Sequence, residues 1–330
     1  MSDWGRFFAI LVIVATGFTL LACGLKGGSY PSTDINFLVP FAPGGATDAV
    51  SRKLTQEAEP LLKGKFVVVN KPGASGTLAV AEVIKAKPDG YTIGLTGIGQ
   101  LALQPQVSQL PYGGPEDCQP ILNVVELPNA LFVQSQASWK TLKDFMEDAK
   151  KQPDQIRVAT TGKLTAGSMI MQELNSFSDV KITSVPFTTG AGEATTALLG
   201  GHIEALITEP GPLLNQVQAG KLRLLAVMQG DRLDSLSDVP SAAEQIGYKS
   251  TVPVPSYAII APKGIDKDII DKLYKTFSDA AQGAGFKQFA KDNAMKIAVL
   301  SPDDLTKRMK ACWPIYAKLI KEVDLGESTK

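Results

Sequence analysis

The stretch Val39-Pro40-Phe41-Ala42-Pro43-Gly44-Gly45-Ala46-Thr47-Asp48 decides how this chain begins to fold. A short apolar run at residues 35–39 leads into it, which is typical of a buried strand. After it, apolar residues repeat at helical spacing at Val50, Leu54, Ala58 and Leu61. Gly64 then marks the end of the helix. The stretch therefore predicts a strand and a helix joined by a double-glycine turn.

The same turn is suited to hold an anion. The first turn of a helix presents unpaired N–H groups and a partial positive charge. Gly44 and Gly45 lack a Cβ, so a ligand can approach the backbone closely. A carboxylate would fit such a cradle. The alternative is that the glycines serve only the geometry of an α/β turn, and the turn alone does not decide between the two.

The N-terminus indicates export. Residues 7–22 form an apolar or small-residue run after a single Arg6, too short and too weakly flanked for a membrane span but suited to a signal peptide. The run ends in Leu20-Leu21-Ala22-Cys23-Gly24, which resembles a bacterial lipobox. We expect residues 1–22 to be removed and residues 23–33 to tether the protein through lipid on Cys23, in the periplasm or on the outer face of the cell membrane. A cleaved signal with an incidental cysteine and an uncleaved helix are the alternatives.

Composition places the rest of the chain among globular proteins. The 330 residues are 44% hydrophobic, enough for two lobes of ordinary size. Lys plus Arg and Asp plus Glu number 33 each and are scattered, so we expect no nucleic-acid partner. Beyond Cys23 only Cys118 and Cys312 remain. They could pair in an oxidising compartment, but two cysteines do not make a disulfide framework, and we interpret both as structural.

Strand-like and helix-like segments alternate along the chain. Short apolar runs predict strands at residues 66–69, 91–95, 156–159, 182–185, 205–207 and 222–227. Longer segments with helical periodicity separate them, which is the βαβ pattern of a parallel or mixed sheet covered by helices. Thr141 with Asp144 predicts a capped helix start, and further helices are expected over residues 266–281 and 302–319.

Catalytic motifs are missing from the sequence. A Ser-His-Asp hydrolase needs a histidine near its nucleophile, and the one histidine, His202, follows two glycines in what reads as a turn entering a strand. Ser75 lacks the spacing of a nucleophile elbow. Zinc, calcium, dinucleotide and P-loop motifs do not occur, so we expect neither a metal nor a cofactor. The sequence favours binding over chemistry.

Several short motifs follow one another between Ile35 and Tyr316. They are VPFAPGG at 39–45 with Asp48, NKPGASG at 70–76, KPDGYT at 87–92, VPF at 185–187 with Gly190, GG at 200–201, AGKLRLLAV at 219–227, DVPS at 238–241 with Glu244 and GY at 247–248, and APKG at 261–264. In this order and spacing they resemble the extracytoplasmic solute-binding proteins of tripartite tricarboxylate transporters, also called the Bug family.

The resemblance implies an α/β, two-lobed periplasmic-binding-protein type II fold with a ligand cleft between the lobes. Two short apolar strands, at 130–134 and 256–260, are expected to cross between the lobes. Lobe 1 would then comprise residues 34–134 plus 256–330, and lobe 2 residues 135–255. The implied function is capture of a small organic carboxylate and its delivery to the membrane permease subunits of a transporter, with the receptor acting as a monomer and not as an enzyme.

The resemblance also implies which residues contact the ligand. Carried over by position, these are Phe41, Gly44, Gly45, Ala46, Thr47 and Asp48 in the first loop, Ser75, Gly76 and Thr77 in the second, Gly97 after the strand at 91–95, and Thr161, Gly162, Phe187, Thr188 and Thr189 in the other lobe. Phe187 has core packing as its alternative. Asp48 would repel an anion on direct contact, so a structural role in capping the helix is favoured over a ligand contact.

Two departures from the family pattern fall in the second lobe. Met169 stands where many relatives carry a histidine, and Thr208-Glu209-Pro210 follows the strand at 205–207 where an aspartate is more familiar. Lys163 could add a positive contact for a dicarboxylate, although an exposed loop lysine explains it equally. Two other functions stay open: a hydrolase or lyase that uses the cleft, and a ligand-sensing lobe of a signalling receptor.

Overall fold

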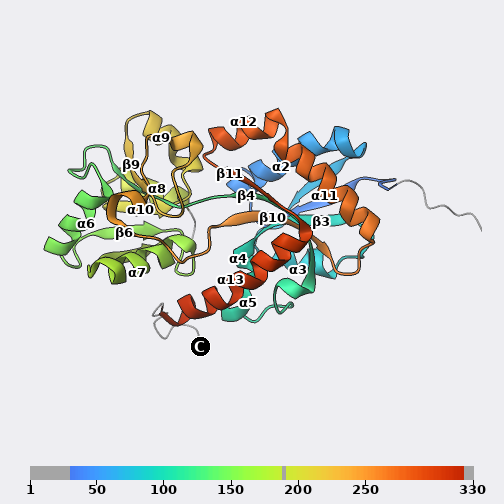
Figure 1. Ribbon diagram of the computed structural model, residues 1–330, viewed down its shortest axis with the longest axis horizontal. Helices are drawn as coiled ribbons and strands as arrows, with labels where there is room; N and C mark the ends of the chain where they lie inside the picture. Colours follow the sequence, from blue (N-terminus) through green and yellow to red (C-terminus); the bar gives the residue numbers. More distant parts are fainter. Residues whose placement is uncertain (1–29, 188–190, 323–330) are drawn as a thin grey trace, which may run out of the picture.

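The computed structural model describes residues 30–187 and 191–322. The expected signal peptide, Cys23 and most of the expected tether lie outside the described residues, as do Thr188 and Thr189. The described chain forms two lobes that lie side by side, with strands running from one towards the other (Figure 1). Within this part of the chain, none of the helices combines the length and the apolar character needed to cross a membrane.

The larger lobe is built on a six-stranded mixed sheet in the order β11-β4-β10-β3-β1-β2. Its strands are β1 (Ile35–Val39), β2 (Phe66–Asn70), β3 (Thr92–Gly97), β4 (Cys118–Glu126), β10 (Ser256–Pro262) and β11 (Lys296–Leu300). β1 pairs in parallel with β2 and β3, whereas β10 is antiparallel to both β3 and β4. The carboxyl ends of β1, β2 and β3 therefore meet at one edge of the sheet.

The second lobe has a five-stranded sheet in the order β7-β6-β8-β5-β9. Its strands are β5 (Ala130–Gln134), β6 (Arg157–Thr160), β7 (Thr183–Pro186), β8 (Ala205–Thr208) and β9 (Leu222–Val227). β6 is parallel to β7 and β8, and β5 is antiparallel to β8 and β9. The six strands predicted from apolar runs are confirmed, and both sheets are mixed.

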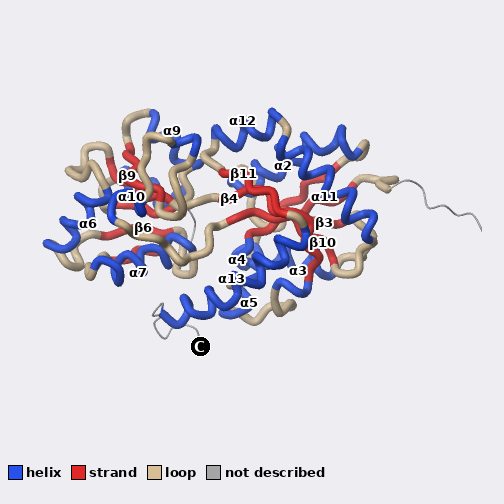
Figure 2. The backbone as a smooth tube through the Cα atoms, viewed as in Figure 1, coloured by secondary structure: helices blue, strands red, loops and turns tan. Residues whose placement is uncertain are grey.

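Helices cover both faces of each sheet (Figure 2). In the larger lobe they are α2 (Ala46–Leu62), α3 (Thr77–Lys85), α4 (Ile98–Ala102), α5 (Gln104–Val107), α11 (Lys267–Gln282), α12 (Ala284–Asp292) and α13 (Pro302–Glu322). In the second lobe they are α6 (Leu142–Lys151), α7 (Ala166–Ser178), α8 (Ala191–Leu199), α9 (Leu214–Gln218) and α10 (Ala242–Ile246). Short 3-10 turns are η1 (Ala74–Gly76), η2 (Pro115–Asp117), η3 (Gly211–Leu213) and η4 (Asp234–Leu236).

Local sequence accounts for several helix ends. Thr141 and Asp144 form the expected capping box, because the Thr141 side chain accepts from the Asp144 N–H and the Asp144 side chain accepts from the Thr141 N–H. α2 ends at Leu62, and Lys63 takes the left-handed conformation with φ 57°. Leu61 was wrongly expected on the apolar face, since it is 50% exposed. The spacing of four from Val50 leads instead to Leu62, which is buried.

The first crossing between the lobes requires a correction. β5 was expected to cross, but it pairs along its length with β8 and β9 and so belongs to the sheet of the second lobe. The chain passes between the sheets earlier, at residues 127–129, because β4 ends at Glu126 in the larger sheet. The strand at 256–260 was also expected to cross, but β10 pairs along its length with β3 and β4 in the larger sheet, so the return crossing lies just before Ser256.

Apolar packing continues from one lobe into the other. The largest core cluster contains Leu38 and Met309 from the larger lobe together with Leu131 and Met169 from the second. A second cluster fills the opposite face of the larger sheet around Phe37 and Phe277. The Cys118 and Cys312 thiols are free and buried in the first of these clusters. The expected structural role of the two cysteines is thus confirmed, without a disulfide.

Candidate ligand-binding site

The loop after β1 is held in shape by the side chain of Asp48. Its Oδ2 atom accepts from the Gly44 N–H at 3.0 Å and from Arg52 Nε at 3.0 Å. Its Oδ1 atom accepts from Asn70 Nδ2 at 3.0 Å and faces the Arg52 guanidinium at 3.0 Å. Asp48 is 5% exposed, so its carboxylate is committed to the loop. A structural role agrees with this geometry, but Asp48 accepts from the Gly44 N–H before the helix and does not cap an N–H group of the helix itself.

The charge of Asp48 is stabilised by these contacts. Burial raises the pKa of the carboxyl group, but the hydrogen bonds from Arg52, Gly44 and Asn70 outweigh it and hold the pKa below its ordinary value. The ionised Asp48 is thus neutralised locally by Arg52. The N–H groups at the start of α2, from Ala46 onward, have no carbonyl partner within the helix and stay available to another anion.

The second predicted loop touches the first. Gly76 has φ +89°, and a Cβ added to it would lie 3.0 Å from Cβ of Pro40 and 3.2 Å from Cζ of Phe41. Ser75 is exposed with φ 53°, whereas Thr77 is buried and donates its hydroxyl to the Ala74 carbonyl at 2.8 Å. Phe41 itself is 38% exposed, which leaves much of its ring free to contact a ligand.

The third predicted position, Gly97, is the last residue of β3, as expected. Gln100, one turn further on, reaches back to it. Its Nε2 atom donates to the Ser75 carbonyl at 3.0 Å, and a Cβ on Gly97 would lie 2.5 Å from its Oε1 atom. Gln100 therefore bridges the loops after β2 and β3. The structure brings the predicted residues of the larger lobe together at one sheet edge.

The predicted residues of the second lobe lie at the carboxyl ends of β6 and β7. Thr161 and Gly162 follow β6, and the Gly162 carbonyl accepts the hydroxyls of Thr160 and Thr165 at 3.1 Å each. The Phe187 N–H donates to the Thr160 carbonyl at 2.8 Å, so the two loops are neighbours. The Phe187 ring packs against a core cluster of this lobe, in agreement with its alternative role in packing.

The two departures from the family pattern have different positions. Met169 is 1% exposed and lies in the core, so its side chain does not line a ligand cleft. Glu209 follows β8 directly, at the end of the sheet that also carries Thr161. Lys163 is exposed in the loop between β6 and α7. His202 lies in an exposed bend before β8, which confirms its predicted place in a turn.

Sequence reasoning missed three residues that shape the first loop. Asn70 donates to both Asp48 Oδ1 and the Phe41 carbonyl, the latter at 2.9 Å. Arg52 lies four residues after Asp48, a spacing that brings opposite charges together on a helix and could have revealed it. Gln100 is the polar residue of the short helix α4 after Gly97, and nothing in the local pattern marks it as a bridge.

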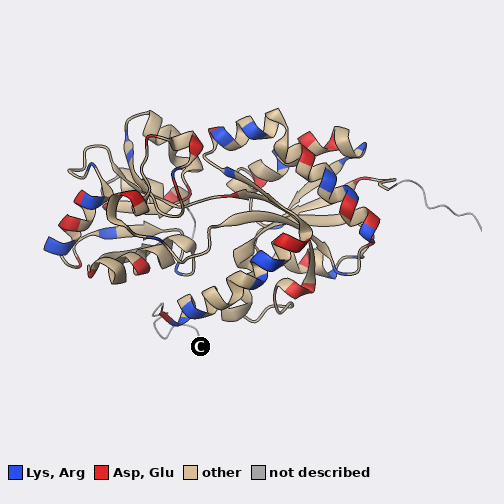
Figure 3. Ribbon diagram, in the orientation of Figure 1, with Lys and Arg blue, Asp and Glu red and all other residues tan. Residues whose placement is uncertain are grey.

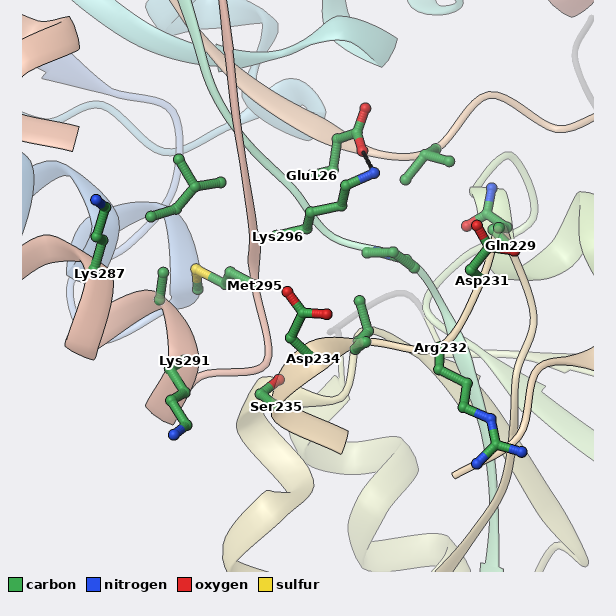
Figure 4. A pocket seen from close by; sticks show the side chains of 16 residues that line it. Glu126, Gln229, Asp231, Arg232, Asp234, Ser235, Lys287, Lys291, Met295 and Lys296 are labelled. Carbon is green, nitrogen blue, oxygen red and sulfur yellow. Dashed lines mark ion pairs between the residues drawn. The ribbon is translucent and has the colours of Figure 1, made fainter. Parts of the chain in front are cut away.

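A separate cavity of about 730 Å³ lies elsewhere between the lobes (Figure 4). Its lining includes Glu126 and Lys296 near the β4–β11 edge, Lys291 of α12, and Asp234 of η4. None of the predicted ligand contacts is among the residues that line it. In the order of the larger sheet, β10 stands between this cavity and the predicted loops. Unlike this cavity, the loops after β1, β2 and β3 combine helix N–H groups with close backbone access.

The electrostatic character of the described surface is mixed. Lys and Arg alternate with Asp and Glu on both lobes in Figure 3. In residues 30–187 and 191–322, no group of three His, Cys, Asp or Glu side chains is placed to hold a metal ion. What the loops offer is therefore backbone N–H groups and the polar side chains around them.

The fold and these loops define a two-lobed solute-binding receptor. The model of the tripartite tricarboxylate transporter family receptor matches residues 50–325, and the chain belongs to this family. It is 30% identical over 305 residues to protein BugT of Bordetella pertussis, covering 90% of this chain and 91% of that protein. The predicted family and type of fold are confirmed. Members of the family are periplasmic receptors, which places the protein among exported proteins.

Solved structures agree with this assignment. The periplasmic binding protein BugD superposes with a TM-score of 0.75 at 30% identity, covering 90% of this chain and 99% of that one. MatC of Rhodopseudomonas palustris, solved with bound malate, superposes with a TM-score of 0.73 at 26% identity, covering 88% of this chain and 100% of that one.

Proposed function

We propose that this protein captures a small organic carboxylate in the cleft between its lobes and delivers it to the membrane subunits of a tripartite tricarboxylate-type transporter. The observation that carries the proposal is the start of α2, where the N–H groups after Gly45 face no internal partner while Asp48 is neutralised by Arg52. Family membership and the malate bound to MatC support a carboxylate as the ligand.

In this proposal the loops of the larger lobe make the first contacts. Gly45, Ala46 and Thr47 present backbone N–H groups to one ligand carboxylate, Gly44 leaves the approach open, and Ser75 adds an exposed hydroxyl. Thr161, Gly162 and Phe187 then close over the ligand from the second lobe. Closure is stabilised only by contacts that the open form lacks, so the ligand drives the change through these second-lobe residues.

Export and anchoring form a second part of the proposal. Cleavage before Cys23 and lipid attachment to its thiol would hold the receptor at the outer face of the cell membrane, close to the permease. The lipobox-like residues before Cys23 support it. Replacing Cys23 by Ser tests it: we expect the exported protein to move to the soluble fraction and to stop incorporating labelled palmitate. Unchanged membrane association would contradict the anchor.

A catalytic use of the cleft has little support in the described residues. The chain's one histidine, His202, precedes β8, whereas the cleft side of that strand is its carboxyl end. Ser75, the nucleophile such an enzyme would need, belongs to the other lobe. We therefore propose a receptor without enzymatic activity that works as a monomer. Turnover of a carboxylate ester that is lost on replacing Ser75 by Ala would contradict this.

Thermal unfolding of the chain from Gly24 onward, with a panel of mono-, di- and tricarboxylates, tests the main proposal. A ligand that binds only the folded state raises the unfolding temperature in proportion to log concentration. Replacing Gly45 by Val should remove the shift, because the larger side chain fills the approach to the N–H groups. Replacing Lys291 by Ala, in the separate cavity, should leave the shift intact. If Gly45→Val keeps the shift and Lys291→Ala removes it, the ligand binds in the separate cavity instead.

A further inference from the structure

Glu209 is a largely desolvated carboxylate of the second lobe that has no cationic partner among the described residues. Its Oε2 atom accepts the Thr208 hydroxyl at 3.2 Å, and among the ion pairs of the described residues none includes it. Glu126, by contrast, is a partly buried carboxylate that pairs with both Arg308 and Lys296. A desolvated carboxylate without a counter-charge is costly and is normally found where something else binds it.

Glu209 lies where the two lobes face each other. It directly follows β8, and two residues later Gly211 approaches the larger lobe so closely that a Cβ there would lie 2.7 Å from the Asn293 carbonyl oxygen. Across from it lies Tyr257 of β10: burial, and then the charge of Glu209, raise the pKa of that phenol. Tyr257 is the register partner of Gly97, the end of the third predicted loop.

The opposite walls of the cleft therefore differ in what they attract. On the larger lobe, the start of α2 attracts a carboxylate. On the second lobe, Glu209 attracts a positive group or a hydrogen-bond donor and repels a second carboxylate. A ligand with only carboxylate groups would be attracted by the larger lobe and repelled by Glu209. A ligand that carries both a carboxylate and a positive group would be attracted by both lobes.

We infer that Glu209 binds an ammonium group of the ligand, so that this receptor selects carboxylates that carry an amine over carboxylates that carry none. The inference rests on the proposed function, since the ligand carboxylate must occupy the start of α2. Glu209 fills the position where the sequence departs from the familiar aspartate, and the departure then concerns the choice of ligand.

The state of Glu209 without ligand fits this role. Burial raises the pKa of its carboxyl group, and the opposing contacts are only its own backbone N–H and the Thr208 hydroxyl. A raised pKa means that the folded protein favours the neutral form, so ionised Glu209 destabilises the empty receptor at neutral pH. An incoming ammonium group stabilises the ionised form. Affinity for an amine-bearing ligand should thus increase as the pH rises through the titration of Glu209.

Calorimetry with matched probes tests the inference: butyrate, its alpha-, beta- and gamma-amino derivatives, and succinate. We expect one amino derivative to bind at least about tenfold more tightly than butyrate and succinate, since a charge-assisted hydrogen bond is of that size. Replacing Glu209 by Gln should abolish the preference, while the exposed control Glu147→Gln should keep it. The amine position in the tightest-binding derivative indicates how far Glu209 lies from the bound ligand carboxylate.

The possible outcomes distinguish the role of Glu209 from the proposed function. If butyrate or succinate binds as well as every amino derivative, or if Glu209→Gln keeps the preference, the inference is wrong while the proposed function stands. If no carboxylate binds, both are wrong. Thermal unfolding of the variant shows whether it is folded. We expect Glu209→Gln to unfold at a higher temperature than the parent near pH 7 and at the same temperature near pH 4.

Discussion

Asn70 Nδ2 donates a hydrogen bond to Asp48 Oδ1 at 3.0 Å, so the last residue of β2 fixes the first turn of α2. The same Nδ2 atom also lies 2.9 Å from the Phe41 carbonyl oxygen, which it supplies with a donor. One amide thus ties two neighbouring loops of the proposed ligand site. The proposed anion cradle is therefore held by side chains that do not themselves need to touch the ligand.

Replacing Asp48 by Asn should destabilise the protein by about 1–3 kcal/mol at neutral pH, because Gly44 and Arg52 lose a charged acceptor. The pKa of Asp48 is depressed in the folded state, so its contribution is present above the unfolded pKa of about 4 and is lost as the pH falls through the lower folded value. Urea unfolding from about pH 7 to pH 2 checks both points. Parallel pH curves for parent and variant would contradict the prediction.

Gln100→Ala should weaken ligand binding about tenfold with little loss of stability. The variant removes the bond to the Ser75 carbonyl, which orders an exposed loop, and a hydrogen bond of this kind is worth about 1 kcal/mol. Gln106→Ala is the matched control, because Gln106 bonds to the Ala102 and Trp313 carbonyls away from the site. Calorimetry should separate the two variants. Equal affinities would show that the bridge has no role in binding.

Gly76→Ala should lower both stability and affinity. The residue has φ +89°, and the new Cβ would press on Pro40 and Phe41. Gly247→Ala isolates the backbone contribution, since Gly247 has φ +73° with nothing within 4 Å of the added Cβ. Both variants should lose about 1 kcal/mol through the left-handed backbone, and only Gly76→Ala should lose ligand affinity. Similar affinities in the two variants would place Gly76 outside the site.

Glu173→Gln should destabilise the second lobe by about 2 kcal/mol or more. The carboxylate of Glu173 accepts the Tyr248 hydroxyl at 2.5 Å, the Ser250 hydroxyl at 2.7 Å and the Thr251 N–H at 3.1 Å. An amide replaces one acceptor oxygen by a donor and leaves hydroxyls facing it. Hydrogen exchange should then quicken at residues 248–252. Uniform exchange across the chain, equal to that of the parent, would be the contrary result.

Local patterns were enough to predict most of the strands and the double-glycine turn before α2. The short apolar runs located β6, β8 and β9 within a residue or two, because they are shorter than a buried helix and are separated by longer segments of helical periodicity. β4 was missed, although it is nine residues long. It carries Pro120 and Asn123, and its strand form is fixed by pairing with β10 and β11 far along the chain.

Contacts between distant residues account for the remaining errors. β5 was placed in the wrong lobe because an apolar strand gives no sign of which sheet it will join; only its pairing with β8 and β9 decides. Gln100 and Asn70 take part in the site through bonds to Ser75 and Asp48, which their own neighbours in sequence do not announce. Glu209 was noticed as a departure, but the absence of a cationic partner beside it could be seen only in three dimensions.

The two crossings are joined to each other by the backbone. The Leu127 N–H donates to the Pro255 carbonyl at 2.8 Å, just where the chain leaves one lobe and returns to it. Two crossing segments that are hydrogen-bonded to each other can bend together, but they resist twisting of one lobe relative to the other. Opening and closing would then follow a single path, and the wall that carries Glu209 would return to the same alignment with the start of α2 after each cycle. The length of the ligand between the two lobes, and not its width, would then set how far the lobes close.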